Sequence, residues 1–407
     1  MGTEHLAELV RLLYPEPHVL DIPGAPAPPG RRPPVVAEYL VIPHARRPRL
    51  GLPVRPRATR LGALRHAPAP RHGRDRLRLA AVRAALGASC APFRSRVRVF
   101  GTAGEDSLQA YLGQVLGEPV ALCLYIGGAR RANHKPVVEI LDAGGRPIGF
   151  AKLGVNALTR DLVRAEAGAL AVLGAAGLRR ATVPPLRHAG RWRDHELLVQ
   201  GVLPVWQRPA GPAGAVPGAM VEVAGASGTA VATLGGSGYR DLLERRLDAV
   251  AGRPGVRDPH VGPALRAAAR HVLARGGGVT LAFGNWHGDW TPWNMHPLRD
   301  TVLVWDWERF TQGVPLGFDA LHCALARAVD AGTGPGEAAA ALVRDAAGHL
   351  APYGVPAATA ELTALLYLLD VGARYLADRL DEAGQRLSAI GDWLLPAVRP
   401  AQVPARW

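Results

Sequence analysis

The segment Asn285-Trp-His-Gly-Asp-Trp-Thr-Pro-Trp-Asn-Met295 is followed, after a short turn, by Thr301-Val-Leu-Val-Trp-Asp-Trp-Glu308. These two segments give the clearest indication of the fold. An apolar run that begins at Val279 leads into the first segment. The start of the second segment has the composition of a short strand, which would deliver its acidic residues at its end. We therefore expect two loops, each fed by a strand, to converge with three oxygen-bearing side chains: Asp289, Asn294 and Asp306.

These three residues fit the demands of phosphoryl transfer. The reaction needs a group that accepts the proton of the attacking hydroxyl, hard oxygen ligands for Mg²⁺ and a cation on the nucleotide phosphates. Asp289, five residues before Asn294, fits a catalytic loop in which the aspartate is the base and the asparagine holds metal. Asp306 would supply the second metal ligand from the neighbouring loop.

The spacing H-G-D-x₄-N, followed by x₁₁-D-x-E, resembles the aminoglycoside phosphotransferase and choline kinase-like family. The family is related to protein kinases, whose catalytic loop has the pattern H-R-D-x₄-N. The resemblance implies an α+β, two-lobed, protein kinase-like fold that uses ATP and Mg²⁺, with a small antiparallel β-rich N-lobe and a larger, mainly helical C-lobe. The residues that fill the pattern are His287, Gly288, Asp289, Asn294, Asp306 and Glu308.

Two alternatives compete with this interpretation of the motif. The H-x-D and D-x-E elements could be surface turns, but two matching spacings, each on an apolar run, disfavour that explanation. A zinc site is the other alternative. Its ligands, His287, Asp289, His296 and Asp306, lack the compact spacing of zinc sites, and Asn294 would have no role in it.

The basic residues identify two further candidates. Of 48 basic side chains, only Lys135 and Lys152 are lysines, so this chain uses arginine at almost every position that needs a cation. A lysine retained in that background indicates a site that needs a compact point charge, such as a phosphate-binding site. Lys152 lies in the apolar segment Pro147 to Leu153, which resembles the kinase strand that carries the phosphate-binding lysine.

The resemblance implies roles for other residues of the N-lobe. Glu166, on a predicted helix from Ala157 to Ala176, would pair with Lys152 and orient it. The loop from Gly127 to Lys135 corresponds in position to the phosphate-covering turn, although it lacks the G-x-G-x-x-G pattern and an ordinary hairpin turn is the alternative. Its candidate nucleotide-binding residues, with those of the segment that links the lobes, are Gly127, Gly128, Lys135, Gln200, Val202 and Leu203.

The N-terminal region carries most of the net charge of +14. Between residues 31 and 98 there are 17 arginines against Glu38 and Asp75. This segment could meet an anionic surface or an acidic partner, or it could be a solvated face beside the catalytic domain. Nucleic acid is disfavoured because Tyr39 and Phe93 are the only aromatic residues available for stacking on bases.

Length and composition set the remaining expectations. The 407 residues suffice for two or three domains, and no run approaches 18 uncharged apolar residues. The start lacks a signal-peptide pattern, so a cytoplasmic protein is expected. Three scattered cysteines indicate neither a disulfide framework nor a cysteine metal site. We expect an N-terminal extension over 1–95, an N-lobe over 96–204 and a helical C-lobe over 205–407.

The sequence thus predicts an ATP- and Mg²⁺-dependent phosphotransferase that acts on a hydroxyl of a small molecule, such as a sugar, an aminoglycoside-like compound or a cell-envelope precursor. A kinase acting on proteins or peptides, and a non-catalytic pseudokinase or scaffold that docks through its basic segment, remain as alternatives. Two further expectations concern the loops. The resemblance implies that Asp319 braces the catalytic loop, with a simple helix cap as the alternative. The tryptophans around Asp289 could stack on a sugar ring or pack as core, and we expect core packing because large aromatic side chains are mostly buried.

Overall fold

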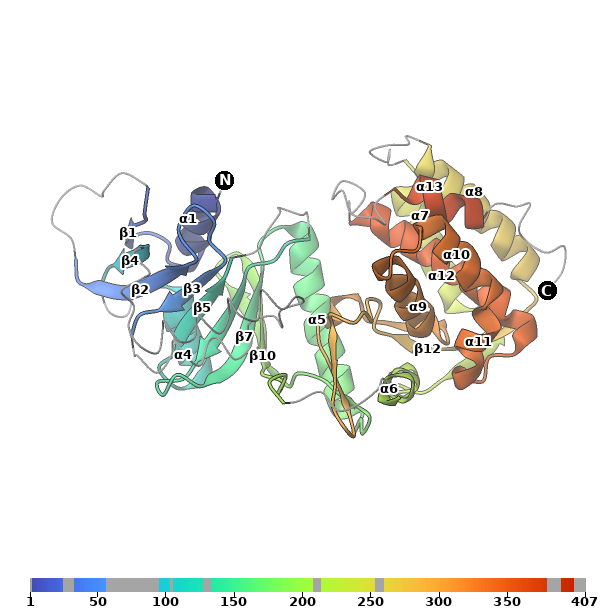
Figure 1. The fold of residues 1–407 in the computed structure, drawn as a ribbon, viewed down its shortest axis with the longest axis horizontal. Helices are drawn as coiled ribbons and strands as arrows, with labels where there is room; N and C mark the ends of the chain where they lie inside the picture. Colours follow the sequence, from blue (N-terminus) through green and yellow to red (C-terminus); the bar gives the residue numbers. More distant parts are fainter. Residues whose placement is uncertain are drawn as a thin grey trace. The chain divides into compact units, whose positions relative to one another are not determined.

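The computed structural model describes residues 2–24, 33–55, 95–102, 105–126, 133–207, 214–252, 260–378 and 389–398. The chain divides into two compact units, which Figure 1 shows in sequence colours. Unit 1 consists of Met1–Arg130, His134–Arg164 and Pro185–Trp206. Unit 2 consists of Arg131–Asn133, Ala165–Pro184 and Gln207–Trp407.

Unit 1 is built on a nine-stranded sheet in which every neighbouring pair is antiparallel. The strand order is β1-β4-β2-β3-β5-β6-β7-β10-β9. The strands are β1 (Val19–Asp21), β2 (Val35–Ile42), β3 (Leu50–Pro53), β4 (Arg96–Phe100), β5 (Ala121–Tyr125), β6 (Val137–Leu141), β7 (Pro147–Gly154), β9 (Leu186–Trp192) and β10 (His195–Gly201).

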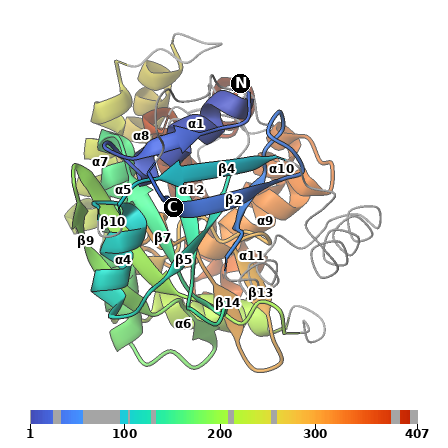
Figure 2. The same cartoon turned by 90° about the vertical axis from the view of Figure 1, so that its left-hand side faces the viewer.

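Two helices cover apolar side chains of this sheet. Helix α1 (Gly2–Leu13) buries Leu6 and Val10 in one cluster with residues of β2 and β4, and Figure 2 shows it beside those strands. Helix α4 (Leu108–Leu116) begins after Ser107, whose hydroxyl accepts a hydrogen bond from the Ala110 N–H at 3.1 Å. This side-chain cap fixes the first turn of α4.

The beginning of the chain belongs to unit 1 rather than to a separate extension. Strands β1, β2 and β3 lie within the nine-stranded sheet, and α1 contributes to its core. The expected boundary at residue 95 therefore does not separate two compact units in the structure. The apolar residues from Asp75 to Leu86 predict a further helix, and this segment lies outside the described residues.

Unit 2 is mainly helical. Helix α12 provides much of its core, from Ala360 to Leu376. The helices are α5 (Ala157–Ala175), which begins in unit 1, α6 (Ala215–Ala224), α7 (Gly238–Val250), α8 (Val261–Gly276), α9 (Phe318–Asp330), α10 (Pro335–Arg344), α11 (Ala346–Leu350), α12 (Ala357–Ala377) and α13 (Ile390–Ala397).

Two three-stranded sheets carry the predicted loops of unit 2. One has the order β11-β12-β15 and the other β13-β14-β8. Their strands are β8 (Ala181–Thr182), β11 (Ala230–Thr233), β12 (Thr280–Trp286), β13 (Met295–Pro297), β14 (Val302–Val304) and β15 (Thr311–Pro315). Short 3₁₀ turns are η1 (Leu234–Gly236), η2 (Trp307–Arg309) and η3 (Ala351–Tyr353).

The predicted fold class is confirmed: the chain is α+β, with an antiparallel sheet in unit 1 and helices dominating unit 2. Unit 1 ends at Trp206, and Ala165–Pro184 belongs to unit 2. Within the described ranges, no single helix could span a membrane. The helical segments Ala346–Tyr353 and Ala357–Ala377 are long and apolar enough to span a membrane only when they are taken together, and they are bent by 102° at their junction.

Candidate active site

The carboxylate of Asp289 lies on the loop that follows β12 and is held at both of its oxygens. Oδ2 accepts a hydrogen bond from Asn294 Nδ2 at 2.9 Å, and Oδ1 lies 3.0 Å from His322 Nε2 on α9. The side chain is 38% exposed, so it stays accessible despite these contacts. A carboxylate that is fixed in orientation and open to solvent meets the geometric requirement for a general base.

His287 joins the Asp289 loop to the loop after β14. Its Nδ1 accepts a hydrogen bond from the Asp289 N–H at 3.1 Å, so in the neutral ring the proton is on Nε2. Nε2 then donates to the carbonyl oxygen of Trp305 at 3.0 Å. The ring is buried against Trp307, with centroids 4.4 Å apart. One imidazole therefore ties together the two loops that the sequence predicts to converge.

Burial of His287 predicts a pH dependence of stability. Desolvation lowers its pKa from 6.5 to about 4, so between these values the unfolded chain binds the proton more readily. The stability that the neutral ring contributes is present above about pH 6.5 and is lost as the pH falls toward 4. We expect the difference in unfolding free energy between wild type and His287→Gln to shrink by about 3 kcal/mol over that range. Urea unfolding of both proteins from pH 4 to 7.5 measures this difference. Unfolding free energies that change in parallel with pH in the two proteins would contradict the prediction.

Asp319 braces the backbone of the Asp289 loop. Its carboxylate accepts hydrogen bonds from the His287 N–H at 2.7 Å and the Gly288 N–H at 3.2 Å. Burial raises the pKa of Asp319 to about 7, although these two N–H groups oppose the shift. No side-chain cap is formed at the start of α9. The contacts of Asp319 are those expected for a brace and not those of a helix cap.

Gly288 and Arg374 fix the path of the same loop. Gly288 has a φ of +87°, and a Cβ at this position would lie 2.5 Å from the carbonyl oxygen of Arg309. A larger residue is therefore excluded here on both conformational and steric grounds. Arg374, on α12, donates to the Gly288 carbonyl oxygen, and its guanidinium lies 5.2 Å from the centroid of the Trp286 ring.

The hairpin of β13 and β14 brings Asn294 close to the segment that contains Asp306. Met295 is opposite Val304, and the Trp305 N–H donates to the carbonyl oxygen of Asn294 at 3.1 Å. Asp306 follows with a φ of +71°, which is uncommon for residues other than glycine. Backbone conformations of this kind cluster at functional sites, which favours the predicted role of Asp306 as a metal ligand.

Asp306 belongs to a cluster of three carboxylates. Each of Glu166, Asp306 and Glu308 offers one oxygen, and these oxygens lie within 4.8 Å of one another. Glu166 is fully buried and also accepts a hydrogen bond from the Trp307 N–H at 3.3 Å. Hard carboxylate oxygens at this spacing fit a divalent cation such as Mg²⁺. The sequence predicts Asp306 as a ligand but gives no sign that Glu166 meets it.

The alternative zinc set is not assembled. In the described part of the chain, the cluster of acidic, histidine or cysteine ligands contains carboxylates alone. Both ring nitrogens of His287 are engaged with the backbone, and His296 Nε2 lies 3.0 Å from the carbonyl oxygen of Gln207. The donor set therefore favours a hard cation over zinc.

The predicted nucleotide-binding residues of unit 1 lie on or near its central strands. Lys152 is 7% exposed on β7, opposite Val137 on β6 and Leu198 on β10. Gln200 is buried near the end of β10, and Val202 and Leu203 follow that strand. Lys135 precedes β6, whereas Gly127 and Gly128 lie outside the described residues. The pairing of Lys152 with Glu166 stays a prediction.

The tryptophans of the loops divide into core and surface. Trp290 and Trp307 are fully buried and pack edge to face, with centroids 6.2 Å apart. The prediction that these rings pack as core is confirmed for this pair. Trp293, by contrast, is 47% exposed beside Asn294. It is the ring of the motif that offers an apolar face to solvent.

The sequence alone does not indicate three residues that the structure places at the site: His322, Tyr367 and Arg374. His322 contacts Asp289 across 33 positions of the chain, and no local motif announces such a contact. One signal was available, because His322 follows Asp319 by three positions on the same predicted helix. Residues at that spacing lie on one face, so a helix that braces the loop with Asp319 also presents His322 toward it.

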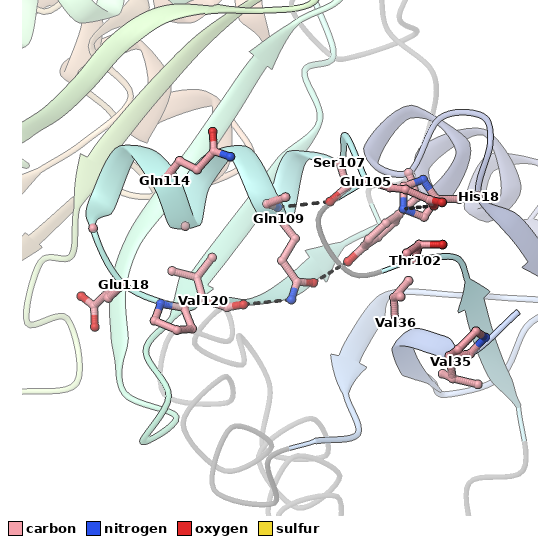
Figure 3. Close-up of a pocket in the computed structure, with 16 residues that line it drawn as sticks. His18, Val35, Val36, Thr102, Glu105, Ser107, Gln109, Gln114, Glu118 and Val120 are labelled. Atoms are coloured by element: carbon pink, nitrogen blue, oxygen red, sulfur yellow. Dashed lines mark hydrogen bonds and ion pairs between the residues drawn. The ribbon is translucent and has the colours of Figure 1, made fainter.

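A cavity of about 760 Å³ in unit 1 holds none of the predicted site residues. Figure 3 shows it between α4 and the segments near β1 and β2, with His18 and Glu105 at one end and Glu118 at the other. His18 Nε2 lies 3.6 Å from Glu105 Oε2, and Gln109 Nε2 donates to the carbonyl oxygen of Val120 at 2.9 Å. The contact of Gln109 ties α4 to the residue that precedes β5.

Comparisons with known proteins give structural similarities alone. No protein-family model and no curated protein matches the chain. A solved protein described as a fructosamine-3-kinase from Haemophilus somnus 129PT has 12% identity, covering 72% of this chain and 97% of its own, with a TM-score of 0.43. Aminoglycoside phosphotransferase APH(4)-Ia, solved with ADP and hygromycin B, has 14% identity, covering 74% and 100%, with a TM-score of 0.48.

A choline/ethanolamine kinase family protein from Mesorhizobium loti has 16% identity, covering 68% of this chain and 93% of its own, with a TM-score of 0.32. Two of these solved proteins are named for the families that the H-G-D-x₄-N motif resembles.

Proposed function

We propose that the protein is a phosphotransferase that moves the γ-phosphoryl group of ATP to a hydroxyl of a small molecule in the presence of Mg²⁺. One observation carries the proposal. Asp289 is held at both carboxylate oxygens yet stays accessible, and His287 ties its loop to the segment that presents Asp306. A base beside carboxylates suited to metal is the arrangement that phosphoryl transfer requires.

In this proposal Asp289 accepts the proton of the acceptor hydroxyl as its oxygen attacks the γ-phosphorus. The bond between that phosphorus and the bridging oxygen breaks, and ADP leaves with the electron pair. The transition state is loose, so the protein contributes chiefly by aligning the reactants and by stabilising charge. The contacts of Asp289 with Asn294 and His322 support this role because they fix the orientation of the carboxylate.

Two groups of residues would hold the metal and the nucleotide. Asp306 and Glu308, with Glu166 beside them, would provide carboxylate oxygens for Mg²⁺, and Asn294 would add its amide oxygen. The bound ion would neutralise charge on the phosphates. Lys152 would contact the phosphates, Lys135 would approach them from the loop before β6, and the segment from Gln200 to Leu203 would bind the adenine.

The exposed ring of Trp293 suggests a class of acceptor. An aromatic face next to Asn294 suits stacking on the apolar face of a sugar ring, and 47% of the residue is available for it. We therefore place sugars and amino sugars first among the acceptors. In the sequence from Asp370 to Asp392 the acidic residues are interspersed with Arg374, Arg379 and Arg386, so this stretch does not favour a polycation.

A screen of hydroxyl acceptors with Mg-ATP tests the proposal. The panel contains neutral sugars, amino sugars, aminoglycosides and sugar-containing cell-envelope precursors, together with casein as a protein acceptor. We expect a product that is 80 Da heavier, read by mass spectrometry, for at least one sugar-containing compound, since transfer adds HPO₃. Phosphorylation of casein alone would replace the proposal by a protein kinase. Nucleotide binding without any product would replace it by a pseudokinase.

A further inference from the structure

A buried chain of hydrogen bonds connects Asp289 to two helices of unit 2. His322, on α9, places Nε2 3.0 Å from Asp289 Oδ1 and Nδ1 2.9 Å from the hydroxyl of Tyr367 on α12. The His322 side chain is 4% exposed, and Tyr367 is completely buried. This series of hydrogen bonds runs from the core of unit 2 to the accessible carboxylate of Asp289.

The positions of the protons follow from the acceptors. An ionised carboxylate can only accept, so His322 Nε2 carries a hydrogen and donates it to Asp289. In a neutral ring Nδ1 then has the free lone pair, and it accepts from the hydroxyl of Tyr367. Burial lowers the pKa of His322 below 6.5, and the charge of Arg374 lowers it further, although Asp289 opposes both effects. The ring is therefore neutral at pH 7.

A neutral donor suits a general base better than a cation does. A lysine, an arginine or a protonated histidine in contact with Asp289 would favour the carboxylate form and lower its proton affinity. A neutral N–H orients the same oxygen with a smaller effect on its basicity. The amide of Asn294 is also neutral, so both side-chain donors to Asp289 hold it without adding a positive charge.

We propose that His322 is a positioning residue for the base Asp289 and that Tyr367 fixes the tautomer in which His322 donates to it. The inference rests on the proposed phosphotransferase function. His322 and Asn294 together prevent rotation of the carboxylate, and each oxygen keeps a further lone pair for the acceptor hydroxyl. No contact between His322 and substrate is required.

A pair of variants separates this role from simple packing. His322→Gln retains an N–H donor near the position of Nε2, whereas His322→Leu fills similar volume without a donor. We expect His322→Leu to lower kcat by about 10- to 100-fold, because a misaligned base slows the chemical step, with the KM for ATP changed by less than about twofold. His322→Gln should recover most of kcat, and Tyr367→Phe should give an intermediate loss. Thermal unfolding checks that each variant is folded.

The assay uses the acceptor found in the screen or, without one, the hydrolysis of Mg-ATP by water. Loss of turnover in Asp289→Asn, with wild-type kcat in His322→Leu, would overturn the inference and leave the proposed function intact. Unchanged turnover in Asp289→Asn would overturn the assignment of the base and the inference with it. Nitrogen-15 NMR of labelled histidine gives a readout that needs no turnover. The resonances that disappear in His322→Gln belong to His322. We expect them to show a protonated Nε2, and a protonated Nδ1 would refute the proposed series of hydrogen bonds.

Discussion

Replacing Asp289 by asparagine should lower kcat by about 10²- to 10⁴-fold, which is the usual contribution of a general base. The amide has the size of the carboxylate but cannot accept the proton of the acceptor hydroxyl. Both side-chain neighbours, Asn294 and His322, donate to Asp289, so an amide at this position can satisfy only one of them well. The lost hydrogen bond should cost about 1 kcal/mol of stability, and the protein stays folded.

Asp300 offers a matched control for this variant. It lies exposed in the turn between β13 and β14, close in sequence to the site but with no proposed role in it. The change Asp300→Asn should leave kcat within about twofold of wild type, as for most surface substitutions. Steady-state kinetics with Mg-ATP, beside circular dichroism and thermal unfolding, compares the two variants. Equal turnover in both would remove Asp289 from the mechanism.

Replacing Asp306 by asparagine should have the second largest effect. The change removes one charge from the cluster with Glu166 and Glu308, and Mg²⁺ prefers carboxylate ligands of this kind. We expect kcat/KM at low Mg²⁺ to fall by about 10²- to 10³-fold, equivalent to roughly 3–4 kcal/mol of transition-state stabilisation. High Mg²⁺ should restore part of the loss, because a weakened site still fills when the cation is abundant.

A Mg²⁺ titration of turnover measures this effect, and the binding of Mn²⁺, followed by electron paramagnetic resonance, measures it without turnover. Asp300→Asn again serves as the control, since it makes the same chemical change in the adjoining hairpin. If Asp306→Asn has the Mg²⁺ dependence and the Mn²⁺ affinity of wild type, the metal site lies elsewhere.

The parts of the site that the sequence predicts are those set by local geometry. Asp289 and Asn294 share one loop, and the short hairpin of β13 and β14 determines how Asn294 meets the segment of Asp306. Asp319 follows these elements in the chain, and its role as a brace is expected from the resemblance that the motif carries. Spacing alone is enough to find Asp289, Asn294 and Asp306, because few conformations connect them.

The residues that the sequence does not reveal depend on packing between distant elements. Tyr367 reaches His322 across 45 positions, and Glu166 meets Trp307 across 141. Strand β3 is missed for another reason. It has four residues in a segment rich in proline and arginine, where composition predicts no regular element, and its place in the sheet comes from pairing with β2 and β5.

The two contacts of helix α9 limit how the protein could be redesigned. Within one helical turn, Asp319 holds the main chain of the His287–Gly288 segment and His322 holds the carboxylate of Asp289. An insertion or deletion of one residue between Asp319 and His322 would rotate one side chain by about 100° relative to the other, so that both contacts could not form together. Exchange of the helices after α9 must therefore join the new sequence after His322 and keep a tyrosine at the position of Tyr367.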